Sequence, residues 1–317
     1  METRSLTIAE TAAYLLSRNS FSIVTHRRPD GDTLGTAAAL CRGLRSLGKT
    51  AHILYNPEVT EKYAHLLDGL SKPNVQPGDV VVSVDVASGG MLPEAFAGLL
   101  GHIDLRIDHH RSSESFTAFE LVDPAAAACG QIIYDILQEM GVHLDIPMAN
   151  ALYTAISTDT GCFRYANTQS HTFEVAAACA SVSPDLPVLN QVLFETNSLK
   201  RLKLQGWIIE HLLFLAEGQI AICALPLEVE KKMELSEDDL ENISGFPRSI
   251  EGVKIAATLR QQEDGIVKLS VRALPAYDAS AVCQKFGGGG HRGAAGASMD
   301  MTMDEAVQAV IAAMPKL

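Results

Sequence analysis

A polar loop near the N-terminus carries residue types that bind hard metal ions. The segment 26–32 reads His-Arg-Arg-Pro-Asp-Gly-Asp and contains one imidazole and two carboxylates, those of His26, Asp30 and Asp32. Its proline stiffens the loop, and its glycine permits backbone angles that other residues avoid. Such an oxygen-rich donor set suits Mn²⁺ or Mg²⁺ better than structural zinc. The alternative is that one aspartate only caps the helix expected from Thr33.

Two further segments place acidic or imidazole groups directly after apolar runs. Asp85 ends a valine-rich stretch, where an unpaired carboxylate would cost several kcal/mol, so it should be paired, neutral or metal-bound. In Asp108-His109-His110, consecutive side chains project differently, so one imidazole can reach a metal while its neighbour faces a substrate. Asp108 can orient an imidazole by hydrogen bonding.

A fourth candidate follows an apolar helix-like stretch in the segment Thr-Asp-Thr-Gly at positions 158–161. Asp159 is either a further metal ligand or a turn residue paired with the glycine that follows. The segment alone favours the turn.

The elements around these residues predict where they meet. Strands are expected at 21–25, 51–55, 79–86 and 105–107, and helices at 5–17, 33–47 (ended by Gly48), 58–67, 130–140 and 148–157. This alternation predicts an α/β fold with a doubly wound, mostly parallel sheet. Ligands bind such sheets beyond the carboxyl ends of the strands, where these polar residues fall. Together they offer enough ligands for two metals about 3.5–4 Å apart, an arrangement that hydrolyses phosphate esters.

The four motifs, in this order, resemble the DHH phosphoesterase family, which is named after the triplet at 108–110. The resemblance covers nearly the whole chain and implies two divalent metal ions, expected to be Mn²⁺, with Mg²⁺ or Co²⁺ as alternatives. It implies that His110 contacts the scissile phosphate, with Asp108 beside it in the catalytic group. One metal would bind His26, Asp30 and Asp85, and the other would bind Asp32, Asp85, His109 and Asp159, with Asp85 bridging.

The C-terminal part predicts a second, smaller α/β domain. The chain is mainly helical from 186 to 216, with 198–215 as a long candidate connector. Strands are expected at 219–225, 253–260 and 266–274, and helical stretches near 228 and at 278–286 and 304–314. We expect a catalytic metal-binding domain over residues 1–190, a helical connector over 191–217 and a substrate-binding domain over 218–317.

A glycine-rich run at 287–296 reads Gly-Gly-Gly-Gly-His-Arg-Gly-Ala-Ala-Gly. It matches G-x-G-x-x-G formally, but it follows a helix-like segment and not a strand, which disfavours dinucleotide binding. A flexible linker rarely carries His-Arg at its centre. The run is expected to be a glycine loop, whose exposed backbone amides can cradle an anion. The run resembles the signature of the C-terminal domain that accompanies many DHH domains. The substrate-binding candidates are Gly288, Gly289, Gly290, His291 and Arg292, and more weakly Arg260, Arg272, Arg111 and Arg164, each of which is otherwise a solvated surface arginine.

Composition indicates which classes of partner and which cellular compartment to expect. A formal net charge of −13 disfavours a basic face that grips long nucleic acid. The six cysteines are scattered without a C-x-x-C pair, which favours reduced, buried thiols. No run predicts a membrane span or a signal peptide, so we expect a cytoplasmic protein.

The domain pair resembles the bifunctional oligoribonuclease and phosphoadenosine-phosphate phosphatase subfamily (nanoRNases). The resemblance implies hydrolysis of short RNA oligonucleotides to nucleoside 5′-monophosphates and removal of the 3′-phosphate of adenosine 3′,5′-bisphosphate. It is also compatible with a homodimer. The alternative main role is cleavage of cyclic or linear dinucleotides such as pApA and pGpG. Family II pyrophosphatases are disfavoured because a Ser-Arg-Lys-Lys-type motif is missing from the sequence. A non-catalytic nucleotide sensor is disfavoured because every matched ligand position is intact.

Overall fold

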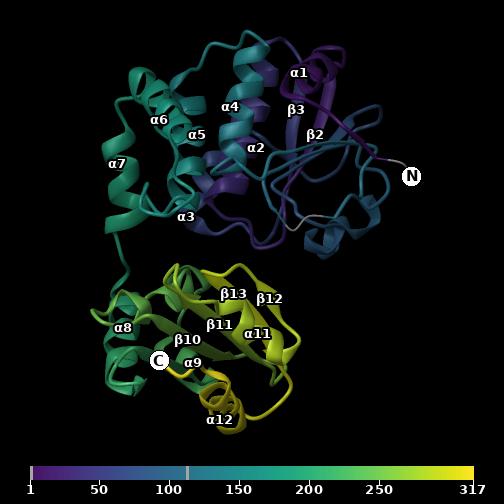
Figure 1. Ribbon diagram of the computed structural model, residues 1–317. Helices are drawn as coiled ribbons and strands as arrows, with labels where there is room; N and C mark the ends of the chain where they lie inside the picture. Colours follow the sequence, from purple (N-terminus) through teal and green to yellow (C-terminus); the bar gives the residue numbers. More distant parts are fainter. Residues whose placement is uncertain (1–2, 112–113) are drawn as a thin grey trace. The chain divides into compact units, whose positions relative to one another are not determined.

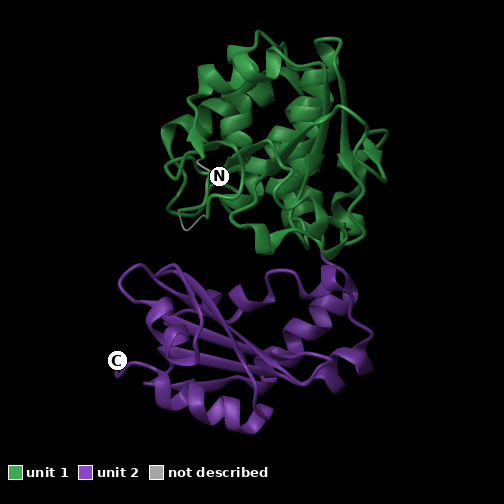
Figure 2. Cartoon of the chain, turned by 90° about the vertical axis from the view of Figure 1, so that its right-hand side faces the viewer, with its two compact units in different colours: residues 1–196 green, residues 197–317 purple. Residues whose placement is uncertain are grey.

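The computed structural model describes residues 3–111 and 114–317. The chain divides into two compact units, residues 1–196 and 197–317 (Figure 2). Each unit has its own sheet and its own buried apolar cluster. Across the described ranges, no helix combines the length and apolar character needed to cross a bilayer.

Unit 1 is built on a seven-stranded sheet in the order β1-β7-β6-β5-β2-β3-β4, and every neighbouring pair runs parallel. Its strands are β1 (Arg4–Ser5), β2 (Ser20–Val24), β3 (Thr50–Leu54), β4 (Ser71–Lys72), β5 (Val80–Val84), β6 (Leu105–Asp108) and β7 (Phe119–Val122). The chain runs from β2 outward to β3 and β4, then returns to place β5 on the other side of β2. The strand order therefore reverses between β2 and β5, which is where open α/β sheets bind ligands.

The helices of unit 1 cover this sheet and bury its largest apolar cluster (Figure 1). They are α1 (Ile8–Leu16), α2 (Gly31–Ser46), α3 (Glu61–Ala64), α4 (Cys129–Glu139), α5 (Ile146–Asp159), α6 (Ser170–Val182) and α7 (Leu186–Asn190). Helices α2 and α5 approach closely at Gly35, where an added Cβ would lie 2.3 Å from the carbonyl oxygen of Ala151. A second cluster, which includes Val24, Leu92 and Phe96, contains residues of the short 3₁₀ segments that follow β5.

Unit 2 contains a six-stranded sheet in the order β12-β13-β11-β10-β9-β8, in which only β9 and β10 are parallel neighbours. Its strands are β8 (Leu213–Leu215), β9 (Ile220–Leu225), β10 (Ile255–Gln261), β11 (Val267–Ala273), β12 (Gly289–Gly290) and β13 (Ala294–Met299). Its helices are α8 (Leu199–His211), α9 (Leu227–Met233), α10 (Glu237–Leu240), α11 (Ala279–Cys283) and α12 (Met303–Ala313). The prediction of a mostly parallel α/β sheet with a smaller second α/β domain is confirmed.

Three local predictions need correction. The helix expected over 58–67 reaches only Glu61–Ala64 plus a 3₁₀ turn, because the side chain of Asn56 accepts the amide of Glu58 and residues 57–58 form a turn instead of a first helical turn. The long helix expected over 198–215 ends at His211. Residues 213–215 pair with β9 instead, since a short apolar run suits a strand as well as a helix.

The third correction concerns the glycine-rich run, which was expected to be a loop. It forms a β-hairpin in which Gly289 pairs with Gly296 and Gly290 with Ala295. An added Cβ on Gly288 would lie 2.2 Å from the carbonyl oxygen of Gly296. The run is therefore glycine-rich partly because its two backbones pass too close for side chains.

Candidate metal centre

The polar loop after β2 starts helix α2. Asp30 is the N-cap of this helix, and its Oδ1 accepts the amide of Thr33 at 3.1 Å. The capping alternative therefore holds for Asp30, yet the same oxygen lies 3.9 Å from Nε2 of His26. One exposed carboxylate thus both caps the helix and faces the imidazole.

Asp85 is at the centre of the site. It directly follows β5, is 2% exposed and has a φ of 59°, a left-handed angle that costs free energy for a residue other than glycine. Its Oδ2 lies 3.6 Å from Nε2 of His26, whereas its Oδ1 lies 3.5 Å from Nε2 of His109. The two carboxylate oxygens therefore face two different imidazoles.

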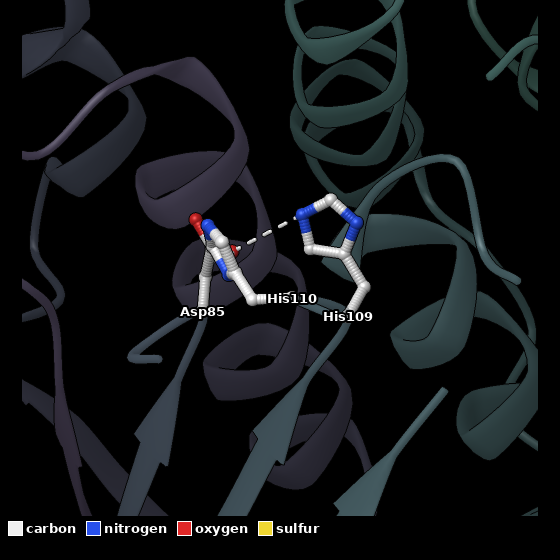
Figure 3. Close-up of side chains that lie close together, drawn as sticks. All are labelled: Asp85, His109 and His110. Carbon is white, nitrogen blue, oxygen red and sulfur yellow. Dashed lines mark ion pairs between the residues drawn. The ribbon is translucent and has the colours of Figure 1, made fainter. Parts of the chain in front are cut away.

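A second group of ligand atoms surrounds His109, whose approach to Asp85 is drawn in Figure 3. Nε2 of His109 lies 3.6 Å from Oδ2 of Asp32 and 3.7 Å from Oδ2 of Asp159, besides its approach to Asp85. Two atoms that bind one ion at about 2.1 Å lie roughly 3–3.5 Å apart, so these separations are slightly longer than those of ligands around a bound ion. The triads His26-Asp30-Asp85, Asp32-His109-Asp159 and Asp85-His109-His110 each bring their ligand atoms within 4.8 Å of one another.

Both imidazoles are oriented by backbone carbonyls. Nδ1 of His26 lies 2.7 Å from the carbonyl oxygen of Arg27, and Nδ1 of His109 lies 3.3 Å from that of Ala126. When each Nδ1 donates to its carbonyl, Nε2 is left unprotonated and turned toward the carboxylates. This is the tautomer that binds metals.

The buried carboxylate of Asp32 is fixed by the start of helix α4. Its Oδ2 accepts the amide of Cys129 at 2.7 Å, and its Oδ1 accepts the amide of Gly130 at 3.0 Å and the hydroxyl of Thr36 at 3.0 Å. Sequence reasoning missed this support, because Cys129 and Gly130, the first residues of α4, follow an apolar stretch and act only through their amides. Unlike Asp30, Asp32 lies inside α2 and is not its cap.

The charges of the site shift its pKa values strongly. Burial alone would lower the pKa of His109, but the carboxylates of Asp32, Asp85 and Asp159 raise it to about 9. Burial would also lower the pKa of His26, but the carboxylates of Asp85 and Asp30 outweigh this effect and raise the pKa to about 9. Burial raises the pKa of Asp159 to about 6 against the attraction of His109. Without a metal, the crowded carboxylates thus draw protons onto the imidazoles.

The ring of His110 lies close to the carboxylates of Asp108 and Asp85. Its Nδ1 lies 2.8 Å from Oδ1 of Asp108, which also accepts the amides of His109 and His110 at 2.8 and 3.3 Å. Asp108 is fully buried, with Nη1 of Arg106 3.8 Å from its Oδ2. The hydrogen bond that Nδ1 donates to Asp108 raises the pKa of His110 and leaves Nε2 of this half-buried ring available to a substrate.

A metal site is indicated where a buried ligand atom accepts no hydrogen bond from the protein. Oδ1 of Asp85 accepts no hydrogen bond from any described residue, although it is buried. Such an atom would carry a large desolvation cost unless a cation offsets it. The residues present therefore fit divalent metal ions.

The predicted substrate residues of unit 2 lie in two places. Gly288 precedes the hairpin, and Gly289 and Gly290 form its first strand. His291 and Arg292 are exposed at its tip, where the amide of His291 donates to the carbonyl of Ala294. Arg272 is paired in register with Ala294, next to that hairpin. Arg260 pairs with Lys268, four register positions away along the sheet, and its guanidinium binds Glu230 at 2.8 Å and Glu237 at 2.9 Å.

The weaker arginine candidates of unit 1 flank the metal centre in sequence. Arg111 is exposed directly after the triplet. Arg164 follows Asp159 by five residues and donates from Nε to the carbonyl of Gly161 at 2.5 Å.

Comparisons with known proteins agree with this architecture. The family model described as the DHH family, N-terminal domain, matches residues 20–156, and that of the DHHA1 domain matches residues 218–316. The chain is 32% identical over 297 residues to the bifunctional oligoribonuclease and PAP phosphatase NrnA of Thermus thermophilus, covering 92% of this chain and 88% of that protein. It is 23% identical to the cyclic-di-AMP phosphodiesterase PdeA of Listeria monocytogenes, covering 92% of this chain but 47% of that protein.

Among solved structures, an exopolyphosphatase-related protein from Bacteroides fragilis superposes with a TM-score of 0.83 at 22% identity, covering 96% of this chain and 94% of that one. At this identity the match shows that the two chains share a fold.

Proposed function

The chain belongs to the DHH phosphoesterase family, and from that premise we propose that it is a metal-dependent hydrolase of short RNA oligonucleotides and of adenosine 3′,5′-bisphosphate. The first activity yields nucleoside 5′-monophosphates, and the second removes the 3′-phosphate. The observation that carries the proposal is the division of the two Asp85 oxygens between two imidazole-carboxylate groups. The name of the Thermus thermophilus relative supports both substrates.

Two metal ions, proposed to be Mn²⁺ with Mg²⁺ or Co²⁺ as substitutes, would be held by one continuous ligand set. When bound, they supply an activated water and offset the negative charge of the phosphate. The oxygen-rich donors, with only two imidazoles, favour these ions over structural zinc. One ion would use His26, Asp30 and Asp85, and the other would use Asp32, Asp85, His109 and Asp159.

His110 is proposed to contact the scissile phosphate. Its Nδ1 is engaged by Asp108, and its raised pKa favours the protonated ring. A protonated Nε2 can therefore donate to a phosphate oxygen as negative charge develops there. Asp108 acts through His110 by fixing the ring orientation.

The hairpin of unit 2 is proposed to hold the nucleotide end of the substrate. Gly288, Gly289, Gly290, His291 and Arg292 are proposed to contact a phosphate there, with the amide of Gly288 already donating to the carbonyl of Cys283. Arg272 pairs in register with Ala294 of the same hairpin. Arg111 is proposed to contact the substrate from the metal centre side. We leave Arg260 out of this set, because Glu230 and Glu237 already neutralise it. In this proposal residues 1–190 form the metal-binding domain, residues 191–217 form the connector between the domains, and residues 218–317 form the substrate-binding domain.

The net charge of −13 supports small substrates over long nucleic acid. We propose that the enzyme acts in the cytoplasm, which the six free cysteines support, and that a homodimer is its assembled form.

A substrate panel with Mn²⁺ tests the proposal. An RNA trimer and adenosine 3′,5′-bisphosphate should be hydrolysed, whereas inorganic pyrophosphate should be turned over slowly. Asp85→Ala and His109→Ala should abolish hydrolysis while circular dichroism stays close to that of the unaltered chain. Rapid pyrophosphate turnover with inert RNA would overturn the substrate assignment, and full activity in either variant would overturn the metal centre.

The similarity to a cyclic-di-AMP phosphodiesterase favours a second candidate function. In this role the main substrates would be cyclic or linear dinucleotides such as pApA and pGpG. Comparing kcat/KM for pApA, cyclic di-AMP and an RNA trimer decides between the two. A preference for the cyclic dinucleotide of more than tenfold would make the second role the principal one.

A further inference from the structure

We infer that Tyr165 is a stacking platform for a nucleobase of the substrate. This inference rests on the proposed function and adds to it a residue that recognises a base, because the groups described so far recognise only phosphates and metals. It is argued from the turn at residues 160–168, which directly follows Asp159.

This turn has a tightly determined backbone. The carbonyl of Thr160 accepts the amides of Arg164 and Tyr165, both at 3.0 Å, and the hydroxyl of Thr160 accepts the amide of Phe163 at 3.0 Å. Cys162 and Phe163 adopt φ angles of 58° and 62°. Consecutive left-handed residues other than glycine cost free energy, so the surrounding contacts must hold the turn in this shape.

A side-chain clamp ties the turn to the metal centre. Nδ2 of Asn167 donates to the carbonyl of Asp159 at 3.2 Å and to that of Ala127 at 2.9 Å. The neighbouring carbonyl of Ala126 is the one that faces Nδ1 of His109. Both ends of the turn are therefore fixed to segments that position candidate metal ligands.

The two aromatic residues of the turn behave differently. Phe163 packs inward, with ring centroids 5.9 Å from Tyr153 and 5.4 Å from Phe173. Tyr165 is 55% exposed, and in the described ranges it takes part in no ring pair. Packing explains Phe163, but it leaves the exposed ring of Tyr165 without an explanation.

Glycine at position 161 lets this ring lie flat on the backbone. An added Cβ on Gly161 would lie 2.4 Å from Cζ of Tyr165 and 2.6 Å from both Cε atoms, so it is a ring face that meets the glycine. The ring of Tyr165 thus lies on Gly161, which is two residues after Asp159, with much of the ring surface open to solvent. A nucleotide substrate whose phosphate reaches the metal centre brings the attached bases close to that centre. Aromatic rings stack on bases of any sequence.

The test compares Tyr165→Phe, Tyr165→Leu and Tyr165→Ala in the full chain with Mn²⁺. Substrates are an adenine-containing RNA dimer and the same dimer with both bases removed. The Ala and Leu variants should raise KM for the adenine dimer at least about fivefold with little change in kcat, whereas Phe should behave like the unaltered chain. On the abasic dimer all four proteins should agree.

Equal losses on both dimers would assign Tyr165 a purely structural role and overturn the inference, as would an unchanged KM in the Ala variant. Mn²⁺ titration by calorimetry checks that the metal centre is intact, and its affinity should be unaltered in all three variants. Failure of the unaltered chain to hydrolyse either dimer would instead contradict the proposed function, so the two failures are distinguishable.

Discussion

The hydroxyl of Thr33 donates a 2.5 Å hydrogen bond to Oδ2 of Asp85, a residue 52 positions later in the chain. This bond joins the first turn of α2 to the end of β5. It fixes the carboxylate so that Oδ1 points toward His109 and His110. Thr33 follows the polar loop directly, yet sequence reasoning treated it only as the start of a helix.

Replacing Thr33 tests this orientation. Thr33→Val keeps the shape but removes the donor, and we expect Mn²⁺ affinity to fall about 10- to 100-fold. Thr33→Ser restores the hydroxyl and should bind Mn²⁺ nearly as well as the unaltered chain. Calorimetric titration measures both, and equal affinities for Val and Ser would contradict this role.

Metal binding should stabilise unit 1. The buried carboxylates of Asp32 and Asp85 repel each other without a cation, so saturating Mn²⁺ should raise the melting temperature and EDTA should reverse the rise. Asp85→Asn should lose most of this shift. Scanning calorimetry with and without Mn²⁺ measures it. A rise of the same size in the Asn variant would show that the ions bind elsewhere.

His52 should make folding sensitive to acid. It is fully buried beside Ser22 and Asp79, and burial lowers the pKa of its ring below the ordinary value near 6.5. As the pH falls through that value, the unfolded chain takes up a proton that the folded chain resists, so stability is lost.

We therefore expect His52→Gln to lose less unfolding free energy between pH 7.5 and pH 5.5 than the unaltered chain. Urea unfolding at both pH values measures the difference. His143→Gln, at an exposed histidine, is the matched control and should leave the pH dependence unchanged. A His52→Gln slope equal to that of the control would refute the prediction.

Arg106 should be a strong contributor to stability. It is 1% exposed, and its guanidinium binds Glu120 at 2.8 Å and the carbonyls of Glu114 and Ala87. Arg106→Met leaves the carboxylate of Glu120 without this partner and should lower the unfolding free energy by about 3–5 kcal/mol. Arg4→Met breaks an exposed ion pair with Glu10 of the same 2.8 Å length and should cost less than about 1 kcal/mol. Similar losses in the two variants would argue against this assignment.

Alanine should destabilise the protein at Gly288 but not at the adjacent Gly289. In Gly288→Ala the new Cβ meets the backbone of Gly296 at 2.2 Å, and we expect a loss of about 1–3 kcal/mol. Gly289→Ala meets nothing within 4 Å and should change stability by less than about 0.5 kcal/mol. Chemical denaturation of both variants checks this, and a tolerated Gly288→Ala would mean that the hairpin relaxes.

The sequence by itself determined the sheet type and the identity of the polar groups at the strand ends. Valine-rich runs such as 79–86 must be buried strands, and parallel strands bring their carboxyl ends to one edge, so Asp85 and His109 had to meet. Local signals also located Gly48 after α2, where its φ is 76°.

Only the tertiary structure decided how those groups are held. The donors to Asp32 are the amides of Cys129 and Gly130, and every sequence carries such amides, so no residue type marks them. The hairpin at 287–296 likewise depends on how closely two backbones approach, which composition alone does not encode. Residue types specify which chemistry is available, whereas the supports act through backbone atoms and distances that exist only once distant segments have packed.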